Sequence, residues 1–293
     1  MNDSDVPIPP ERCLYTLIHA PRENHDALLR ELVIPIVREL RRSPELDSLF
    51  FARYNQPDWQ LRFRILGVPA WVDGPVRELI DQRLPSLRDR GLLEGWEFAS
   101  YQREYERYGG EEGMRLCEKI FLHDTLACCE LIDAEDRGLL GKSRREYSLV
   151  FVERFLDLMR FDRERRIAFY RQGYAWAVDN DAWSAEDLRL LEERYQGLKE
   201  GLLALFHGDR GDDPDALYGG AEPARIARAC LDATRPVLDE LLAAHAAGRI
   251  PQDLVHLAWS LCHMHCNRIG VEVSAEAIIR FFMHRLHQDE AIL

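Results

Sequence analysis

Three short arginine-bearing segments hold the residues of this chain that are best suited to chemistry. They are Trp59–Arg64, Glu104–Gly110 and His263–Arg268. A guanidinium group is always charged, and its planar set of donors matches a carboxylate with two parallel hydrogen bonds. A histidine titrates near neutral pH and can accept or give a proton there. The three segments together predict an acid/base site that holds an acidic group.

The first segment predicts a strand with two arginines on one face. Apolar and polar residues alternate from Gln60 to Ile65, so the apolar side chains share one face while Arg62 and Arg64 share the other. Like charges on one strand face repel each other unless acids or a bound anion lie opposite. Two interpretations stay open: a solvated face with acidic neighbours on the next strand, or an anion site.

The second segment comes where a strand ends and a long helix begins. The pair Gly109-Gly110 permits a turn with positive φ. The helix that follows presents free N–H groups and a partial positive charge, which favour an anion. Arg107 would reinforce such a site, and an exposed turn of mixed charge is the alternative.

The third segment lies at the end of an apolar helix, where a histidine is often a satisfied core residue. Cys262, His263, His265 and Cys266 crowd together in the sequence. On a helix, however, the pairs 262/266 and 263/265 point in different directions, so one ion could not collect all four. We therefore predict no metal site, and the absence of a nucleotide-binding motif predicts no cofactor.

The composition is that of an ordinary globular protein with an acidic balance. The 293 residues are 46% hydrophobic and 30% charged, with a formal net charge of −13, which argues against a nucleic-acid binder. Seven cysteines fit a reduced compartment. No apolar run approaches the roughly 20 residues that a membrane span needs, and Met1–Asp5 lacks a signal-peptide pattern. We expect a cytoplasmic protein without a membrane or direct nucleic-acid partner.

The periodicity predicts an α+β fold whose strands all lie in residues 1–110. Strand-like runs at Cys13–Ala20, Leu49–Tyr54, Trp59–Leu66 and Trp96–Gln102 alternate with helical runs at 24–42 and 74–92. This order is typical of a ferredoxin-like mixed sheet with helices on one face. Residues 111–293 are almost wholly helical, and we expect this portion to pack on the sheet portion as one catalytic domain. The expected helices are 112–134, 144–160, 162–177, 185–206, 222–247, 251–268 and 275–287.

Local signals refine these helices. Ser184 and Ser274 are expected N-caps, because acids follow each of them in the next turn. Pro35 and Pro236 lie inside helical patterns and are expected to kink or split the helices that contain them.

Taken together, these segments resemble the C-terminal elimination domain of class I lantibiotic dehydratases, also called the thiopeptide-type bacteriocin biosynthesis domain. The likeness runs from about Arg12 to Leu286 and includes Leu49–Tyr54 and Glu118–Asp124. Its most specific part is Glu-x-Glu-Arg-Tyr-Gly-Gly at 104–110, and all parts occur in the family's order.

The resemblance implies that the protein removes glutamate from glutamylated Ser or Thr of a precursor peptide and leaves dehydroalanine or dehydrobutyrine. Implied catalytic residues are Arg62, Arg64, Glu104, Arg107 and His263. Implied substrate-binding residues are Arg53, Tyr108, Asn267 and Arg268. The implied partners are the precursor peptide, with leader and core, and a separate protein that transfers glutamate from glutamyl-tRNA, because this chain lacks that domain. A homodimer is left open.

Two further functions remain as alternatives. Stand-alone members of the family include thiopeptide pyridine synthases, which join two dehydroalanines in a formal [4+2] cycloaddition with loss of the leader. The chain could also be a non-catalytic leader-peptide carrier that adds the peptide to an exposed strand edge. Elimination is favoured because the charged set that would hold a glutamyl carboxylate is intact.

Overall fold

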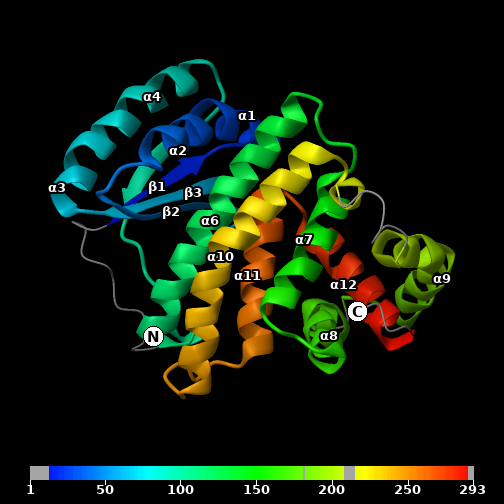
Figure 1. Ribbon diagram of the computed structural model, residues 1–293. Coiled ribbons are helices and arrows are strands. Elements are labelled where there is room, and N and C mark those ends of the chain that lie inside the picture. Colours follow the sequence, from blue (N-terminus) through cyan, green and yellow to red (C-terminus); the bar gives the residue numbers. More distant parts are fainter. Residues whose placement is uncertain (1–12, 181, 208–214, 290–293) are drawn as a thin grey trace. The chain divides into compact units, whose positions relative to one another are not determined.

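The computed structural model describes residues 13–180, 182–207 and 215–289 (Figure 1). Met1–Asp5, from which we predicted the lack of a signal peptide, lies outside the described residues. The chain forms two compact units. The first holds the residues up to Arg137 together with Asp239–Pro251, and the second holds Gly138–Leu238 and the residues from Gln252 on.

The first unit is built on a four-stranded sheet. Its strands are β1 (Cys13–His19), β2 (Leu46–Tyr54), β3 (Gln60–Gly67) and β4 (Gly95–Ala99), in the order β2-β3-β1-β4. All neighbouring strands are antiparallel. The predicted α+β class and the predicted order of strands and helices are confirmed. The prediction of a mixed sheet is wrong, because every pair of neighbouring strands is antiparallel.

Two helical segments of the first unit lie on one side of this sheet, where Figure 1 shows α2 and α4. Segment 24–42 contains α1 (His25–Leu28), a π-helical turn (Leu29–Val33) and α2 (Ile34–Leu40), so the irregularity directly precedes Pro35. The second segment contains α3 (Pro69–Trp71), a π-helical turn (Val72–Val76) and α4 (Arg77–Asp89). The apolar face of β3 is completely buried, as its alternation predicts.

The first unit also contains α5 (Tyr105–Tyr108) and the long helix α6 (Gly110–Asp136). Helix α6 packs along the edge strand β2. The ring of Phe121 lies 5.2 Å from that of Phe50, and the Ser48 hydroxyl donates a 2.7 Å hydrogen bond to the Glu118 carbonyl. This contact covers part of the sheet face that carries Arg62 and Arg64.

The second unit is helical, as predicted. It contains α7 (Arg144–Leu158), α8 (Arg163–Asp179), α9 (Ala185–His207), most of α10 (Ala221–Ala246), α11 (Leu254–Ile269) and α12 (Val273–Asp289). Helix α12 packs mainly against α8, and α11 packs against α7 and α8. All seven cysteines of the chain are buried thiols.

Most of the expected boundaries are confirmed to within a few residues. Ser184 caps α9, since its Oγ accepts a 3.1 Å hydrogen bond from the Asp187 amide. Ser274 is not an N-cap, because α12 already begins at Val273. Helix α10 continues through Pro236, so this proline does not split the helix, and the predicted alternative of a kink stays a prediction.

The two compact units divide the chain differently from the predicted boundary at residue 110. Strands occur only before that point in the described residues, yet α6 groups with the sheet. None of the helices in the described ranges has the length and apolar character needed to cross a membrane.

Candidate functional site

Strand β3 presents Arg62 and Arg64 on one face, as its alternation predicts. The residues directly opposite them on β1 and β2 are apolar or aromatic: Leu17 and Ala52 beside Arg62, and Tyr15 and Phe50 beside Arg64. In this register neither β1 nor β2 places an acidic residue opposite either arginine. The interpretation of a strand face balanced by acids on the next strand is therefore wrong for β3.

Arg64 lies among aromatic rings. Its guanidinium carbon is 4.2 Å from the ring centre of Tyr15, 4.9 Å from that of Tyr101 and 5.5 Å from that of Phe50. Its Nε atom is buried and has no hydrogen-bond partner, and within the described ranges Arg64 forms no ion pair. A buried donor without a partner is costly, and an anionic ligand would satisfy it.

Arg62 also lacks an acidic partner among the residues that the structure describes. Its guanidinium carbon lies 3.4 Å from the ring centre of Tyr54. Its hydrogen bonds are long, at 3.5 Å to Oε1 of Gln60 and 3.5 Å to the carbonyl of Gln56. Arg62 is thus a second cation on this face whose charge no carboxylate of the described chain neutralises.

Arg107 is the third cation of this neighbourhood, and Glu104 is its partner. Arg107 donates a 2.9 Å hydrogen bond to the Glu104 carboxylate, and its guanidinium carbon lies 5.3 Å from the ring centre of Tyr108. Burial alone would lower the pKa of Arg107, but Tyr108 and Glu104 outweigh it, and Tyr54 adds to the increase. Tyr54 therefore neighbours both Arg62 and Arg107.

Arg103 and Glu118 belong to the same neighbourhood, and the three sequence segments did not reveal them. Arg103 donates from Nε and from a terminal nitrogen to the two oxygens of Glu118, at 2.8 and 2.7 Å. The Glu118 side chain is only 6% exposed. The only sequence signal was the position of Glu118 in the block that resembles the family.

Arg53 occupies different surroundings from the two β3 arginines. Arg53 follows Ala52 on β2, so its side chain points to the opposite face, where it donates a 2.6 Å hydrogen bond to Asp26. The structure does not bring Arg53 to Arg62 and Arg64. Tyr108 is buried, and its ring packs on Phe121 at 5.3 Å.

The predicted turn at Gly109-Gly110 is confirmed. Both residues have positive φ values, of 81° and 87°. A Cβ atom added at Gly113 would lie 2.0 Å from the Tyr108 carbonyl oxygen. Only a glycine fits at Gly113, because the backbone of α5 approaches α6 so closely there.

In the second unit, His263 has a carboxylate partner. Its Nδ1 lies 2.8 Å from Oε2 of Glu276, and its ring stacks on Trp259 with centroids 5.4 Å apart and an angle of 7°. The ring of His265 instead stacks on Phe151, 4.1 Å away. The two histidines thus face different neighbours, as their spacing on a helix predicts.

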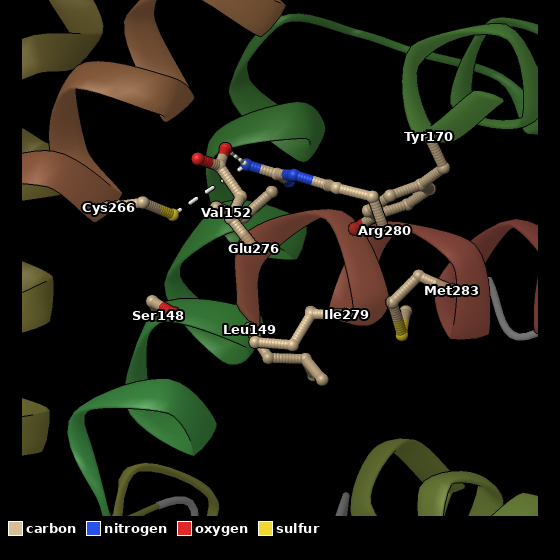
Figure 2. A pocket seen from close by; sticks show the side chains of 9 residues that line it. All are labelled: Ser148, Leu149, Val152, Tyr170, Cys266, Glu276, Ile279, Arg280 and Met283. Atoms are coloured by element: carbon tan, nitrogen blue, oxygen red, sulfur yellow. Dashed lines mark hydrogen bonds and ion pairs between the residues drawn. The ribbon is translucent and has the colours of Figure 1, made fainter. Parts of the chain in front are cut away.

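Glu276 connects His263 to the buried Arg280, and Figure 2 shows the pair formed by Glu276 and Arg280. The second oxygen of Glu276, Oε1, accepts a 3.0 Å hydrogen bond from Arg280, which lies one turn further along α12. Burial would raise the pKa of Glu276, but the hydrogen bond with His263 and the charge of Arg280 lower this pKa below its usual value. Glu276 therefore stays ionised.

A small cavity of about 10 Å³, room for about one water molecule, adjoins this pair. Figure 2 shows Glu276 and Arg280 pointing toward each other from α12, with Ser148 and Cys266 lining the same space. The implied substrate-binding residues Asn267 and Arg268 are both on α11: Arg268 is completely buried and Asn267 is partly exposed.

The structure brings Arg62, Arg64, Glu104 and Arg107 together in the first unit and places His263, Asn267 and Arg268 in the second. Sequence reasoning missed Glu276, since it lies 13 residues from His263 on another helix. That the two sets serve one acid/base site stays a prediction.

Comparisons with known proteins give consistent similarities. The sequence model of a family described as "Lantibiotic biosynthesis dehydratase C-term" matches residues 14–287. The subtilin biosynthesis protein SpaB of Bacillus subtilis is 24% identical over 226 residues, which are 75% of this chain and 20% of SpaB. This chain thus spans about a fifth of the length of that curated relative.

Three solved structures share the fold. The tRNA-dependent lantibiotic dehydratase MibB from Microbispora sp. 107891 superposes with a TM-score of 0.72 and 23% identity, covering 97% of this chain and 29% of MibB. TsrL has a TM-score of 0.68 and 15% identity, with 94% of each chain covered. TbtD, the pyridine synthase from thiomuracin biosynthesis, has a TM-score of 0.65 and 14% identity, with 95% of this chain and 98% of TbtD covered.

Proposed function

The chain belongs to the lantibiotic dehydratase C-terminal family, and from this premise we propose that it eliminates glutamate from glutamylated Ser or Thr of a precursor peptide. The product is dehydroalanine or dehydrobutyrine. The observation that carries this proposal is that neither Arg62 nor Arg64 has an ion-pair partner in the described chain, although both lie on one face of β3. Two such cations are suited to an anion that arrives with the substrate.

The reaction removes the α-proton of the esterified residue. The electron pair left on the α-carbon forms the new double bond to the β-carbon, and the ester oxygen departs with glutamate as a carboxylate. The α-proton is only weakly acidic, so the negative charge that develops on the adjacent carbonyl oxygen needs preorganised positive charge. Arg62 or Arg64 supplies that charge.

The remaining residues handle the leaving group and the proton. Arg107 binds the departing glutamate, and Glu104 holds Arg107 in place through the 2.9 Å ion pair. His263 is the acid/base. In this proposal the two sets of residues act in one reaction, with Tyr108, Asn267 and Arg268 contributing to substrate binding. Arg53 receives no role, since Asp26 already pairs with it on the other face.

The proposal also names the partners of the reaction. The substrate is a ribosomal precursor peptide, and a separate protein that uses glutamyl-tRNA supplies the glutamyl groups. MibB, which is named a tRNA-dependent lantibiotic dehydratase and contains a region similar to this chain, supports the involvement of a tRNA in the reaction.

Pyridine synthesis is the second candidate, because this chain matches the pyridine synthase TbtD over 98% of TbtD's length. In that reaction the arginines would polarise an amide carbonyl, and holding the two alkenes together would supply much of the acceleration.

Mass spectrometry of the precursor peptide after incubation with the protein distinguishes these functions. Loss of the glutamyl mass from an esterified peptide, leaving dehydrated residues, supports elimination. Inertness toward that peptide, together with leader release and loss of water from a peptide that already carries dehydroalanines, would establish the pyridine synthase instead. If both peptides bind without any change in mass, the remaining interpretation is a non-catalytic leader-peptide carrier.

A further inference from the structure

The carboxylate of Glu276 serves two partners with its two oxygens. Oε2 lies 2.8 Å from Nδ1 of His263, and Oε1 accepts from Arg280 at 3.0 Å. The Glu276 side chain is 6% exposed and that of Arg280 is 2% exposed, whereas that of His263 is 23% exposed. The three residues therefore form a chain of contacts that runs from the interior of the second unit to a partly accessible imidazole.

Arg280 is held in place by α8. A Cβ atom at Gly173 would lie 2.6 Å from Cγ of Arg280, so the arginine side chain occupies space that any other residue at position 173 would fill. Its guanidinium carbon lies 4.8 Å from the ring centre of Phe169, also on α8. Both contacts restrict the rotamers of Arg280 and so fix the position of its charge.

Two other titratable groups near Glu276 and Arg280, Cys266 and Tyr170, are neutral. Burial raises the pKa of Cys266 and that of Tyr170 well above their usual values. Glu276 and Arg280 are thus a charged pair, and its carboxylate contacts the His263 imidazole directly. The charges of Glu276 and Arg280 are opposite, so the buried pair has no net charge when His263 is neutral.

We infer that Glu276 and Arg280 are positioning residues that select one tautomer of His263. An ionised carboxylate only accepts hydrogen bonds, so Nδ1 of His263 must carry the hydrogen. In the neutral ring this leaves the lone pair on Nε2, which becomes the atom that takes or gives a proton. Arg280 keeps Glu276 ionised, and the proton stays on the imidazole. The catalytic consequence rests on the proposed function, whereas the tautomer itself does not.

The test is a long-range ¹H–¹⁵N spectrum of the full chain labelled at its 10 histidines. The signals of His263 are assigned by comparison with His263→Gln. In the neutral form of His263 we expect the Nδ1–H tautomer, with Nε2 at the chemical shift of an unprotonated nitrogen. An Nε2–H tautomer in the wild-type protein would overturn the inference without any further variant.

Variants then test the cause. Glu276→Gln leaves Arg280 buried without its carboxylate and can cost the fold, so the charge-balanced double variant Glu276→Gln/Arg280→Met is measured beside it. Because a glutamine side chain both donates and accepts, we expect a mixture of His263 tautomers. Gly173→Ala should displace Arg280, which pairs with Glu276, and should thereby shift the His263 signals although residue 173 lies on another helix. Unchanged His263 signals in all of these variants would refute the inference.

Glu272→Gln is the matched control, since it makes the same chemical change at an exposed residue four positions earlier. It should leave the His263 signals as they are, and the signals of His265 report in every variant whether α11 is intact. If the proposed function holds, Glu276→Gln/Arg280→Met lowers kcat about 10- to 100-fold with little change in KM. A wild-type Nδ1–H tautomer without any eliminase activity would contradict the proposed function and leave the tautomer assignment standing.

Discussion

The carboxylate of Glu118 accepts hydrogen bonds at both of its oxygens from the single guanidinium group of Arg103, at 2.8 and 2.7 Å. Glu118, Arg103 and Arg64 all act electrostatically on the hydroxyl of Tyr101, so they share one neighbourhood. Because Arg103 occupies both oxygens of Glu118, this buried acid does not neutralise Arg64. The pair thus explains how a carboxylate and an unpaired arginine coexist in one small region.

Arg103→Met should destabilise the first unit, because Glu118 would be left buried without its cation. We expect the free energy of unfolding to fall by about 3 kcal/mol. We also expect slower turnover of glutamylated peptide, since Glu118 would then compete with substrate for Arg64. Urea unfolding measures the first effect. The double variant Arg103→Met/Glu118→Gln should recover most of the stability, and equal stability of the single and double variants would contradict this account.

Arg64→Met should slow elimination strongly and leave stability almost unchanged. Loss of one preorganised cation costs about 100- to 1,000-fold in rate. The free energy of unfolding should change by about 1 kcal/mol or less, since only contacts with aromatic rings are lost. The control is Arg77→Met, because the Arg77 guanidinium carbon also lies over an aromatic ring, 4.1 Å from the ring centre of Phe98. Equal rates for the two variants would remove Arg64 from the mechanism.

Arg107→Ala should cause glutamylated peptide to accumulate, because the leaving carboxylate loses its cation. We expect a rate about 100- to 1,000-fold below that of the wild type, read from the mass of the peptide over time. Glu104→Gln should have a smaller effect, since Arg107 keeps its charge and loses only the partner that orients it. Full turnover by Arg107→Ala would exclude this role for Arg107.

Gly113→Ala should displace helix α5, which carries Arg107. The added methyl group would lie 2.0 Å from the Tyr108 carbonyl oxygen, so α5 must move. We expect a loss of about 1–3 kcal/mol in the free energy of unfolding together with reduced activity. Gly197→Ala on α9 is the matched control, because no atom lies within 4 Å of the added methyl group. It should stabilise the protein by about 0.5–1 kcal/mol, and the opposite ranking would show that the close approach at Gly113 is unimportant.

His25 should make the protein less stable below pH 6.5. Burial, together with the nearby charge of Arg53, lowers the pKa of His25 from 6.5 to about 4. The hydrogen bond between its ring and the Ala20 carbonyl raises this pKa, but by less than burial and Arg53 lower it. Between these pH values the unfolded chain binds a proton at His25 and the folded chain does not, so stability is full above pH 6.5 and falls as the pH decreases to about 4. The loss is about 3 kcal/mol in total.

To check this prediction, the free energies of unfolding of the wild type and of His25→Phe are measured with denaturant between pH 4.5 and 7 and compared. The variant should lose less stability over this range. His284 in the second unit also has its pKa lowered to about 4 by burial, so His284→Phe gives the corresponding difference for that unit. Identical pH profiles for His25→Phe and wild type would refute the assignment.

The sequence by itself determined the elements and the faces of their side chains. Periods of two and 3.6 residues depend on neighbouring residues alone, so the alternation in β3 was enough to place Arg62 and Arg64 on one face. The same rule separated His263 from His265 on α11. The two glycines at 109 and 110 predicted the positive φ values of the turn before α6. These features are local, and local patterns record them.

Only the tertiary structure decided which partner each charged side chain has. Arg53 pairs with Asp26 at a separation of 27 residues, and His263 meets Glu276 on the next helix. The aromatic surroundings of Arg64 come from β1, β2 and the segment after β4. Such contacts depend on how strands pair and how helices pack, and no period in the sequence encodes that. For this reason the arginine segments could be found by reading the chain, whereas the residues that keep Arg64 unpaired and His263 oriented could not.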